Sequence, residues 1–509
     1  MSEKLEADVI VIGGGASGIT AAVAAAEKDA SVIVIEKGGS TGGAANMGMG
    51  FFAVGSPYQT GQMVDLSVED AFRFFMEYSH WKTDARLVRK YFGMSADTVR
   101  WVEAMGISFL GAYKYFKQSR QTWHVVKTQG SNSPAERAAS NLFKAITERA
   151  VELGVDIMYF TKATEILMEE GHATGVRLVL EDGSVCDAEC SCVIVASGGF
   201  GDDPMMIKEY TGYEWGKDLH SFRVPGIVGE GLKMMWAAGA GKNEPTMEMI
   251  YTTPGVTNSY KTISETMRQP NLFVNLDGMR FMNEEIANNT VYTGNALSRQ
   301  RERVAFSVID DSIVDSYRKT GLDYITYHHN IKTVDKWDYE VDAYLSGKAV
   351  EGTGVDLGDM DKDEQKDVKA FVAADSIEEL CALTGIDPKN LEATVAEYNE
   401  AASRGDDSLF FKKREFLKPL AGGRIYAAKH YPGAYGSLGG VMVNDSLEVL
   451  TQEGFKIPGL YSCGVDACGI FGDSYCFYMP GSTMGFALNS GRMAGANAID
   501  YIDSDAFVE

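Results

Sequence analysis

Three glycines, Gly13, Gly15 and Gly18, constrain the fold of this 509-residue chain more than any other feature. They follow an apolar, β-branched run at residues 8–12 and precede an alanine-rich run at residues 19–28. The first run is typical of a buried strand and the second of a helix. A glycine-rich turn between a strand and a helix lets the backbone approach a ligand, and the helix N-terminus favours an anion. The spacing therefore predicts a phosphate-binding turn.

A second buried strand at residues 31–36 completes the unit and ends on Glu36. Strand, helix and parallel strand within about 30 residues make a βαβ unit of the Rossmann type. A carboxylate at the end of the second strand can accept hydrogen bonds from a ribose hydroxyl. The combination predicts a dinucleotide-binding domain of the α/β class, and the alternative is a tight turn that binds no ligand.

The charge balance narrows the classes of partner. The chain has 47 Lys and Arg residues against 71 Asp and Glu residues, which gives a net charge of −24. Binding to nucleic acid or to anionic lipid needs a basic face. We therefore expect no nucleic-acid partner, and the sign of the charge alone identifies no other one.

Neither a membrane segment nor a metal site is expected. Residues 9–26 carry no charge, but their glycines and alanines are not typical of a lipid-facing helix, and no basic signal region precedes them. The seven cysteines are scattered and do not form a disulfide pattern. Cys186, Cys190 and Cys192 lack a fourth ligand nearby. The sequence predicts a cytoplasmic protein without a membrane span.

Glycine-rich segments recur along the chain in a specific order. They lie at residues 37–50, 193–199, 229–231, 459–466 and 481–485. A simple NAD-binding domain does not need the first of them. In this order, and over nearly the whole length, the chain resembles the flavoprotein family of fumarate reductases, succinate dehydrogenase flavoprotein subunits and ketosteroid dehydrogenases. The resemblance implies an FAD-dependent oxidoreductase acting on CH–CH groups.

The resemblance also implies the fold and the domain boundaries. It predicts a Rossmann-like FAD-binding domain of the glutathione-reductase type, built from residues 1–241 and 416–509 at the two chain ends. An α+β capping domain at residues 242–415 is inserted between them and carries a family signature at residues 275–284. In the family, this capping domain closes over the substrate.

The family motifs assign the FAD contacts position by position. Asp466 matches an acidic residue that faces the flavin ribityl chain, and Ser437, Thr483 and Met484 match positions beside the isoalloxazine. Some members attach FAD through a histidine, and residues 37–50 contain none, so we expect non-covalent FAD. The other implied contacts lie in the N-terminal motifs: Gly13, Gly15, Ala16, Ser17, Glu36, Lys37, Thr41, Gly42, Gly43, Gly48 and Gly50.

Departures from the family pattern bear on the substrate. Fumarate reductases hold a dicarboxylate with two histidines and an arginine, and protonate it with a second arginine. The matching positions here are Thr253, Gly436, Tyr478 and either Asn288 or Asn289. Two carboxylates without cationic partners in a desolvated site are strongly unfavourable. We therefore expect this chain not to reduce fumarate.

One charged pair of the family is kept. Glu265 and Arg268 resemble the residues that relay protons to the active site in fumarate reductases. The alternative is a solvated ion pair on one helix face, which stabilises by roughly a few tenths of a kcal/mol. Both interpretations stay open at this point.

Tyr478 precedes Pro480 and Gly481 and resembles a tyrosine of the ketosteroid dehydrogenases that hydrogen-bonds the substrate carbonyl or moves a proton. A buried phenol can stabilise a developing enolate. Tyrosines in place of charged clamps favour a neutral, flat, apolar substrate such as a ketosteroid or another polycyclic or aromatic enone. Tyr435 and Asn288 are further catalytic candidates. The candidates for substrate contact are Tyr251, His124, Gly481 and Tyr475, with a core position as the alternative for the two tyrosines and a core or surface position as the alternative for His124.

The expected reaction moves a hydride between flavin N5 and a carbon β to a carbonyl or similar group, in either direction. One alternative is an oxidase or hydroxylase that uses oxygen, and another is a fumarate reductase-like enzyme for a different unsaturated acid. A third is a flavin-bearing electron-transfer protein without substrate turnover. The sequence contains no haem or iron–sulfur motif, so we expect a separate electron donor or acceptor.

Overall fold

The structure is a computed structural model that describes residues 5–128, 130, 137–220, 224–257, 259–324, 331–348 and 369–504. The chain divides into two compact units. Unit 1 comprises Met1–Gly212, Val224–Met247 and Gly436–Glu509, and unit 2 comprises Tyr213–Arg223 and Glu248–Tyr435. Each unit is described separately below.

The second boundary between the units differs from the prediction. The predicted boundary after residue 415 falls inside unit 2, which extends to Tyr435. The reason is the long strand β14 (Ile425–Leu438), whose first part, Ile425–His430, pairs with β12 (Ala305–Asp310) in the unit 2 sheet. Pairing between distant strands thus sets this boundary, and a change of composition along the sequence does not reveal it.

A largely parallel, eight-stranded sheet forms the centre of unit 1. The two runs predicted as strands pair in parallel, with Val9 opposite Val32, and the first of them also pairs in parallel with β9. Such strands are buried on both faces, which accounts for their unbroken apolar sequence. The order is β15 (Glu448–Leu450), β16 (Lys456–Ser462), β9 (Val185–Val195), β1 (Leu5–Ile12), β2 (Val32–Ile35) and β6 (Asp156–Met158), with β7 (Lys162–Glu169) and β8 (His172–Val179) attached through β9.

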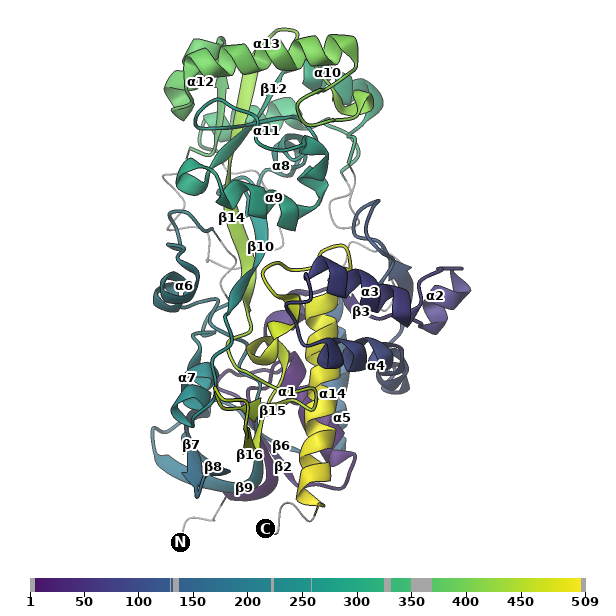
Figure 1. Cartoon of the computed structure of the whole chain (residues 1–509), viewed down its shortest axis with the longest axis vertical. Coiled ribbons are helices and arrows are strands. Elements are labelled where there is room, and N and C mark those ends of the chain that lie inside the picture. The colour runs from purple at the N-terminus through teal and green to yellow at the C-terminus, as the bar shows by residue number, and fades with distance from the viewer. Residues whose placement is uncertain are drawn as a thin grey trace. The chain divides into compact units, whose positions relative to one another are not determined.

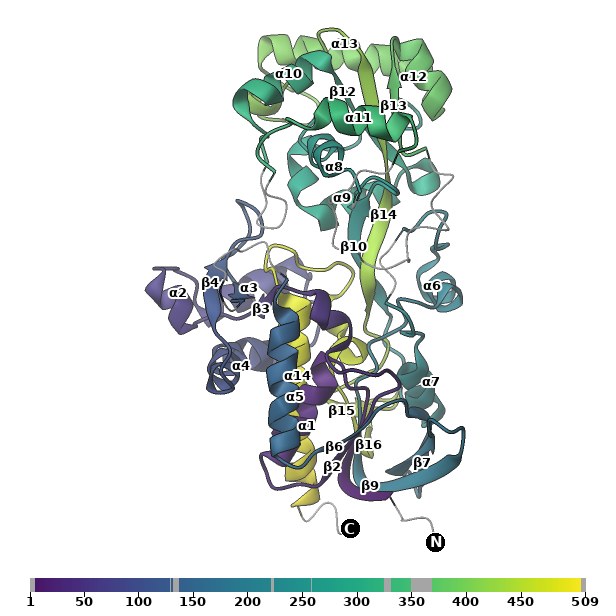
Figure 2. The ribbon, with the colours of Figure 1, turned by 180° about the vertical axis from the view of Figure 1, so that it is seen from behind.

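Helices from the two ends of the chain pack together in unit 1. Helix α14 (Ser482–Ile502) lies along α1 (Ala16–Ala26), with α5 (Ala139–Glu152) on another side of α1 (Figures 1 and 2). Glycines allow this close approach, because a Cβ at Gly491 would collide with the carbonyl oxygen of Ser17. The prediction that both chain ends build the FAD-binding fold is confirmed. Within the described residues, no helix combines the length and the apolar character needed to cross a membrane.

The chain between β2 and α5 adds a second, three-stranded antiparallel sheet to unit 1. Its central strand is β5 (Trp123–Val126), between β3 (Gly50–Phe52) and β4 (Phe109–Tyr113). Three helices precede β4 in the sequence: α2 (Pro57–Gly61), α3 (Val68–Tyr78) and α4 (Ala85–Ala104). Two more, α6 (Pro204–Thr211) and α7 (Glu230–Ala237), follow β9.

Unit 2 has a five-stranded sheet in the order β10-β14-β12-β11, with β13 paired to β14. Three of its strands, β10, β12 and β13, pair with β14 from distant parts of the chain, so the unit is an insertion with its own core. The remaining strands are β10 (Thr246–Thr252), β11 (Leu272–Asn275) and β13 (Phe371–Ala374). The helices are α8 (Lys261–Met267), α9 (Thr290–Ser298), α10 (Asp311–Thr320), α11 (Trp337–Leu345), α12 (Ile377–Thr384) and α13 (Pro388–Arg404).

Candidate active site

The three glycines of the first turn have different roles. Gly13 has φ 101°, a conformation that favours glycine, and a Cβ there would lie 2.5 Å from the carbonyl oxygen of Ala196. A Cβ at Gly18 would collide with the carbonyl oxygen of Gly13. At Gly15, by contrast, the nearest atom to a Cβ is 4.0 Å away. The fold itself does not require glycine at Gly15, and the open space there fits close approach by a phosphate.

The start of helix α1 supplies donors at the same place. Gly15 is its N-cap and makes no side-chain capping bond, and the helix continues with Ala16 and Ser17. An uncapped first turn presents backbone N–H groups together with the positive end of the helix dipole. Pyrophosphate fits this arrangement, so the predicted FAD contacts at the glycine turn agree with the local geometry.

Glu36 is tied to the glycine turn. One carboxylate oxygen accepts from the backbone N–H of Gly14 at 2.8 Å, and the other accepts from the N–H of Gly38 at 2.6 Å. Gly14, whose N–H makes the first of these bonds, was not among the predicted site residues. The contact orients the carboxylate at the end of β2, where the family binds a ribose.

The second glycine-rich segment lies directly against the first turn. The N–H of Gly42 donates to the carbonyl oxygen of Gly14 at 2.9 Å, and a Cβ at Gly43 would lie 3.4 Å from the Cα of Gly15. Gly42 and Gly43 both have positive φ, 91° and 52°. Thr41 shares a hydrogen bond of 2.7 Å with the hydroxyl of Thr147. The two glycine segments therefore form one continuous surface of backbone.

Gly48 and Gly50 bring later parts of unit 1 close to this segment. A Cβ at Gly48 would collide with the methyl group of Met484 in the first turn of α14, and one at Gly50 would collide with the carbonyl oxygen of His124. Met484 and its neighbour Thr483 thus lie on the same unit as the glycine segments, as their predicted role requires.

The side chain of Lys37 does not point to the glycine turn. Its ammonium group forms an ion pair with Glu230 and donates to the carbonyl oxygen of Gly226. Lys162 pairs with the other oxygen of Glu230 at 2.6 Å. The predicted contact of Lys37 with FAD stays a prediction. The lysine instead ties the segment after β2 to helix α7.

Asp466 joins two glycine-containing loops. Its carboxylate is fully buried and accepts from the backbone N–H groups of Ser197, Gly198 and Gly199 at 2.6, 3.2 and 2.8 Å. Burial raises the pKa of this carboxyl, against the effect of the surrounding donors. Ser437 makes a similar link, since its hydroxyl accepts from the N–H of Phe200 at 2.8 Å. Both predicted cofactor contacts thus meet the end of β9.

Tyr478 lies in a partly buried group of aromatic rings within unit 1. Its ring centroid is 5.4 Å from that of Phe116, 6.0 Å from that of Phe74 and 6.5 Å from that of Tyr78. The backbone N–H of Arg120 donates to the carbonyl oxygen of Tyr478 at 2.7 Å. We call these five residues the Tyr478 cluster. It holds Tyr478 among apolar ring faces, as a flat apolar ligand would require.

Several predicted substrate contacts are core residues. His124 is fully buried, with its ring nitrogens 2.6 Å from the hydroxyl of Ser56 and 3.0 Å from the carbonyl oxygen of Thr122. Burial lowers the pKa of His124 to about 4. Tyr475 is 3% exposed and packs on Phe471 at 4.8 Å. Both side chains are therefore part of the packed core in this structure, because polar partners or apolar neighbours already surround them.

Gly481 acts through the backbone. It has φ 86° at the N-cap of α14, and a Cβ there would lie 2.6 Å from the backbone nitrogen of Phe52. The N–H of Phe52 donates to the carbonyl oxygen of Gly481 at 2.9 Å, and the hydroxyl of Thr122 donates to the carbonyl oxygen of Pro480 at 3.2 Å. The residue shapes the turn that carries Tyr478, and no side chain of its own can contact a substrate.

In unit 2, Tyr251 and the charged pair are packed together. Tyr251 is 1% exposed and donates its hydroxyl hydrogen to the carbonyl oxygen of Ala287 at 3.0 Å, so it too is a core residue in this structure. The guanidinium carbon of Arg268 lies 4.5 Å from the centre of the Tyr251 ring. Glu265 is 7% exposed. The alternative of a solvated surface pair therefore does not hold, whereas the proposed proton relay stays a prediction.

A buried histidine in unit 2 was missed by the sequence analysis. His430 on β14 lies 2.8 Å from the hydroxyl of Thr253 and 2.8 Å from that of Ser307. Burial and the nearby charge of Arg268 lower the pKa of His430 to about 3, so its ring is neutral. Thr253 is the position where fumarate reductases carry a histidine. A neutral, fully engaged His430 does not replace that cationic partner.

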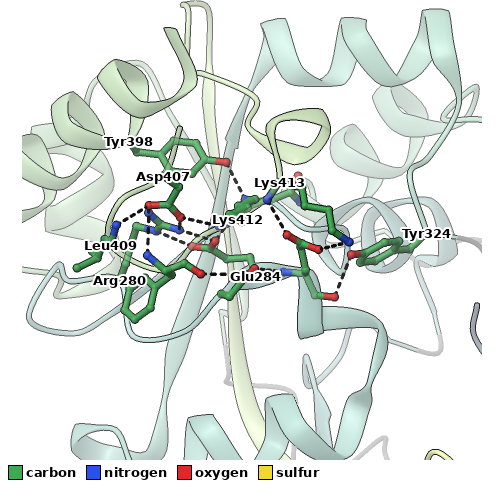
Figure 3. A network of polar contacts seen from close by, with 12 residues as sticks. Arg280, Glu284, Tyr324, Tyr398, Asp407, Leu409, Lys412 and Lys413 are labelled. Atoms are coloured by element: carbon green, nitrogen blue, oxygen red, sulfur yellow. Dashed lines mark hydrogen bonds and ion pairs between the residues drawn. The ribbon is translucent and has the colours of Figure 1, made fainter. Parts of the chain in front are cut away.

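A buried ionic network holds the family signature in unit 2 (Figure 3). Arg280 forms paired hydrogen bonds with Glu284, both of 2.8 Å, and with Asp407 at 3.0 and 2.8 Å. Lys412 approaches Glu284 at 3.3 Å and donates to the hydroxyl of Tyr398 at 2.8 Å. Burial lowers the pKa of Lys412. The network anchors the short helix η2 (Glu284–Asn288), which ends on a catalytic candidate.

The other candidates of unit 2 lie at the ends of elements. Asn288 ends η2, and Asn289 caps α9 through its side-chain oxygen, which accepts from the N–H of Tyr292 at 3.2 Å. The amide nitrogen of Asn289 is buried and has no hydrogen-bond partner among the described residues. Tyr435 is the last residue of unit 2 and is 47% exposed. The side-chain amide nitrogen of Asn289 can therefore still donate a hydrogen bond to a ligand.

Comparisons with known proteins agree with this geometry. The family model described as an FAD binding domain matches residues 8–476. A vinyl phenol reductase from Lactiplantibacillus plantarum is 30% identical over 98% of each chain, and a fumarate reductase (cytochrome) from Shewanella frigidimarina is 26% identical over 97% of this chain and 77% of its own. The crystal structure of a 3-ketosteroid-Δ4-(5α)-dehydrogenase from Rhodococcus jostii superposes with a TM-score of 0.73 at 21% identity, over 98% of both chains.

Proposed function

The chain belongs to the FAD binding domain family of reductases and dehydrogenases that act on C=C bonds, and on this premise we propose that it reduces a C=C bond conjugated to a neutral, flat ring. FAD, when bound, supplies the hydride in such a reaction. The residues of this chain bind the cofactor, orient the substrate and supply the proton. We further propose that FAD is bound non-covalently.

The observation that carries the proposal is the environment of Tyr478. In place of the clamp arginine of fumarate reductases, the Tyr478 cluster offers aromatic rings within 5.4 to 6.5 Å of the tyrosine. Ring faces favour a flat conjugated substrate over a dicarboxylate. The similarity to a vinyl phenol reductase over 98% of both chains supports the same substrate class.

Proton supply is proposed to come from this chain's own side chains. The phenol of Tyr478 can donate to the oxygen or carbon on which negative charge develops. Glu265 on α8 and Arg268, which follows the helix, are proposed to return the proton from solvent, since Glu265 is buried. Asn289 is a neutral donor and can only orient a ligand.

An anaerobic mixing experiment tests the proposal. The holoprotein is reduced with dithionite and mixed with para-vinylphenol, a ketosteroid enone, cinnamate, fumarate or oxygen, while the flavin absorbance is followed. We expect the fastest reoxidation by para-vinylphenol or the enone. Preferential reoxidation by cinnamate would favour an unsaturated acid as substrate, and preferential reoxidation by oxygen would favour an oxidase. Either result would contradict the proposed function.

A further inference from the structure

Arg120 is an exposed cation in the Tyr478 cluster. Its guanidinium carbon lies 5.0 Å from the centre of the Phe74 ring, and that ring lies 6.0 Å from the ring of Tyr478. Its backbone N–H holds the carbonyl oxygen of Tyr478 at 2.7 Å. Among the residues that the structure describes, the guanidinium group has this ring contact but no ion pair or hydrogen bond of its own.

Arg120 has no ion pair among the described residues, although the chain carries a net charge of −24. Some other cations of unit 1 do have acidic partners: Arg73 pairs with Glu69 at 2.7 Å, Lys90 with Asp445 at 2.9 Å, and Lys82 with Asp473. A guanidinium stacked on a ring keeps its planar set of donors free at the edges and loses little rotational freedom on binding. Arg120 is therefore oriented and available for an oxygen ligand.

We propose that Arg120 is a specificity-determining residue that binds an oxygen carried by the conjugated ring of the substrate. The proposal rests on the proposed function and narrows its substrate class to ring compounds with a phenol oxygen. One guanidinium suits one oxygen, whereas a dicarboxylate needs cationic partners at both ends. A phenol is neutral in water, with a pKa of about 10, and its oxygen can accept a charge-assisted hydrogen bond from a guanidinium group. A carboxylate on the ring offers the same charge chemistry and is separated from the phenol by experiment.

Ligand titration of the oxidised holoprotein tests this without turnover. The probes are para-ethylphenol, para-ethylbenzoate and para-ethylanisole, which carry a phenol, a carboxylate and a methylated oxygen and contain no reducible C=C bond. Binding is followed through the flavin absorbance of the wild-type protein and of the Arg120→Leu, Arg120→Lys and Lys117→Leu variants. Lys117 is exposed in the same segment, so its variant loses the same charge without touching the cluster. The backbone bond from residue 120 to Tyr478 is kept in every variant.

We expect Arg120→Leu to weaken the binding of para-ethylphenol about 10- to 100-fold, as loss of a hydrogen bond to a charged group does. The Arg120→Lys variant should recover part of this affinity. Binding of para-ethylanisole should change far less, and Lys117→Leu should bind like the wild type. Equal phenol binding by wild type and Arg120→Leu overturns the assignment, even if the wild type reduces para-vinylphenol. Equal weakening of all three probes also overturns it, because it indicates damage to the cluster.

The remaining outcomes separate the two proposals. If only the binding of para-ethylbenzoate depends on Arg120, the arginine binds a carboxylate. The proposed phenol substrate and the proposed neutral substrate are then both wrong. If Arg120→Leu slows flavin reduction by the electron donor while leaving all three titrations unchanged, Arg120 serves the donor and the substrate assignment is wrong. A wild type that binds none of the probes and reduces no phenol contradicts the proposed function and this assignment together.

Discussion

The carboxylate of Glu36 accepts a hydrogen bond from the backbone N–H of Gly14 at 2.8 Å, which joins the end of β2 to the turn after β1. The second oxygen accepts from the N–H of Gly38 at 2.6 Å. The acidic residue that is expected to meet a ribose is therefore also part of the scaffold of the phosphate turn. A substitution at Glu36 should act on both.

Glu36→Ala should lower FAD affinity by about 10- to 100-fold, because each bond between a charged group and a donor contributes roughly 1.5 to 3 kcal/mol. The measurement is the dissociation constant of FAD for the apoprotein, followed by flavin fluorescence. Glu6→Gln, at an exposed position near the start of β1, is the matched control and should bind like the wild type. Unchanged affinity of Glu36→Ala would remove Glu36 from the cofactor site.

Gly15 and Gly18 should respond differently to substitution. Gly15 has φ −66° and open space where a Cβ would be, so Gly15→Glu should fold yet bind no FAD, because it places bulk and charge where the pyrophosphate approaches. Gly18→Ala should instead destabilise the fold itself, since its methyl group meets the carbonyl oxygen of Gly13. Circular dichroism of the apoproteins and FAD content after gel filtration distinguish the two effects. Stoichiometric FAD in Gly15→Glu would refute the site.

FAD should leave the protein intact on acid or heat denaturation. The expectation follows from the absence of histidine in residues 37–50, the segment through which some relatives attach the cofactor. After precipitation, the flavin is measured by its absorbance in the supernatant and identified by chromatography. Flavin retained in the protein pellet after washing in denaturant would show a covalent link.

Tyr478→Phe tests the catalytic tyrosine. Removal of one donor from a desolvated site typically costs about 2.7 to 4 kcal/mol, so single-turnover flavin reoxidation should slow roughly 100- to 1000-fold. The flavin spectrum and the thermal stability should be nearly unchanged, because phenylalanine keeps the ring contacts with Phe74 and Phe116. Asn288→Ala is the comparison and should have a smaller effect, because a neutral amide is a poor acid. A wild-type rate for Tyr478→Phe would leave Tyr478 as a wall of the site only.

The free energy of unfolding should depend on pH through ionisation of the Asp407 carboxylate. Burial opposes ionisation of this carboxylate, but the hydrogen bonds and charge of Arg280 outweigh burial and hold its pKa down to about 2. A depressed folded-state pKa contributes stability above the unfolded pKa of about 4, and this contribution is lost as the pH falls from about 4 to about 2. Urea denaturation of wild type and Asp407→Asn between about pH 5 and about pH 2 should show that the difference in their free energies of unfolding shrinks toward low pH. A pH-independent difference would contradict the ionised pair.

Local sequence was sufficient for the FAD-binding fold. The strand before Gly13, the glycine spacing and the acidic end of the second strand are all defined within a few tens of residues, and the structure places them as a parallel βαβ unit. Such a pattern is readable because side-chain size and backbone freedom act on immediate neighbours. The second glycine segment could be predicted from the sequence for the same reason, although its contact with Gly14 could not.

The places of the candidate side chains depended on contacts between distant segments. Nothing near His124 in the sequence shows that Ser56 completes its hydrogen bonds, and nothing near Tyr251 shows that Ala287 accepts from its hydroxyl. The same holds for Arg120, whose stacking on Phe74 and lack of an acidic partner among the described residues become visible only in three dimensions. Local pattern determines which chain segment approaches the cofactor, because it sets backbone geometry. Only tertiary packing decides which polar side chains are already satisfied and which remain available to a ligand, because their partners come from anywhere in the chain.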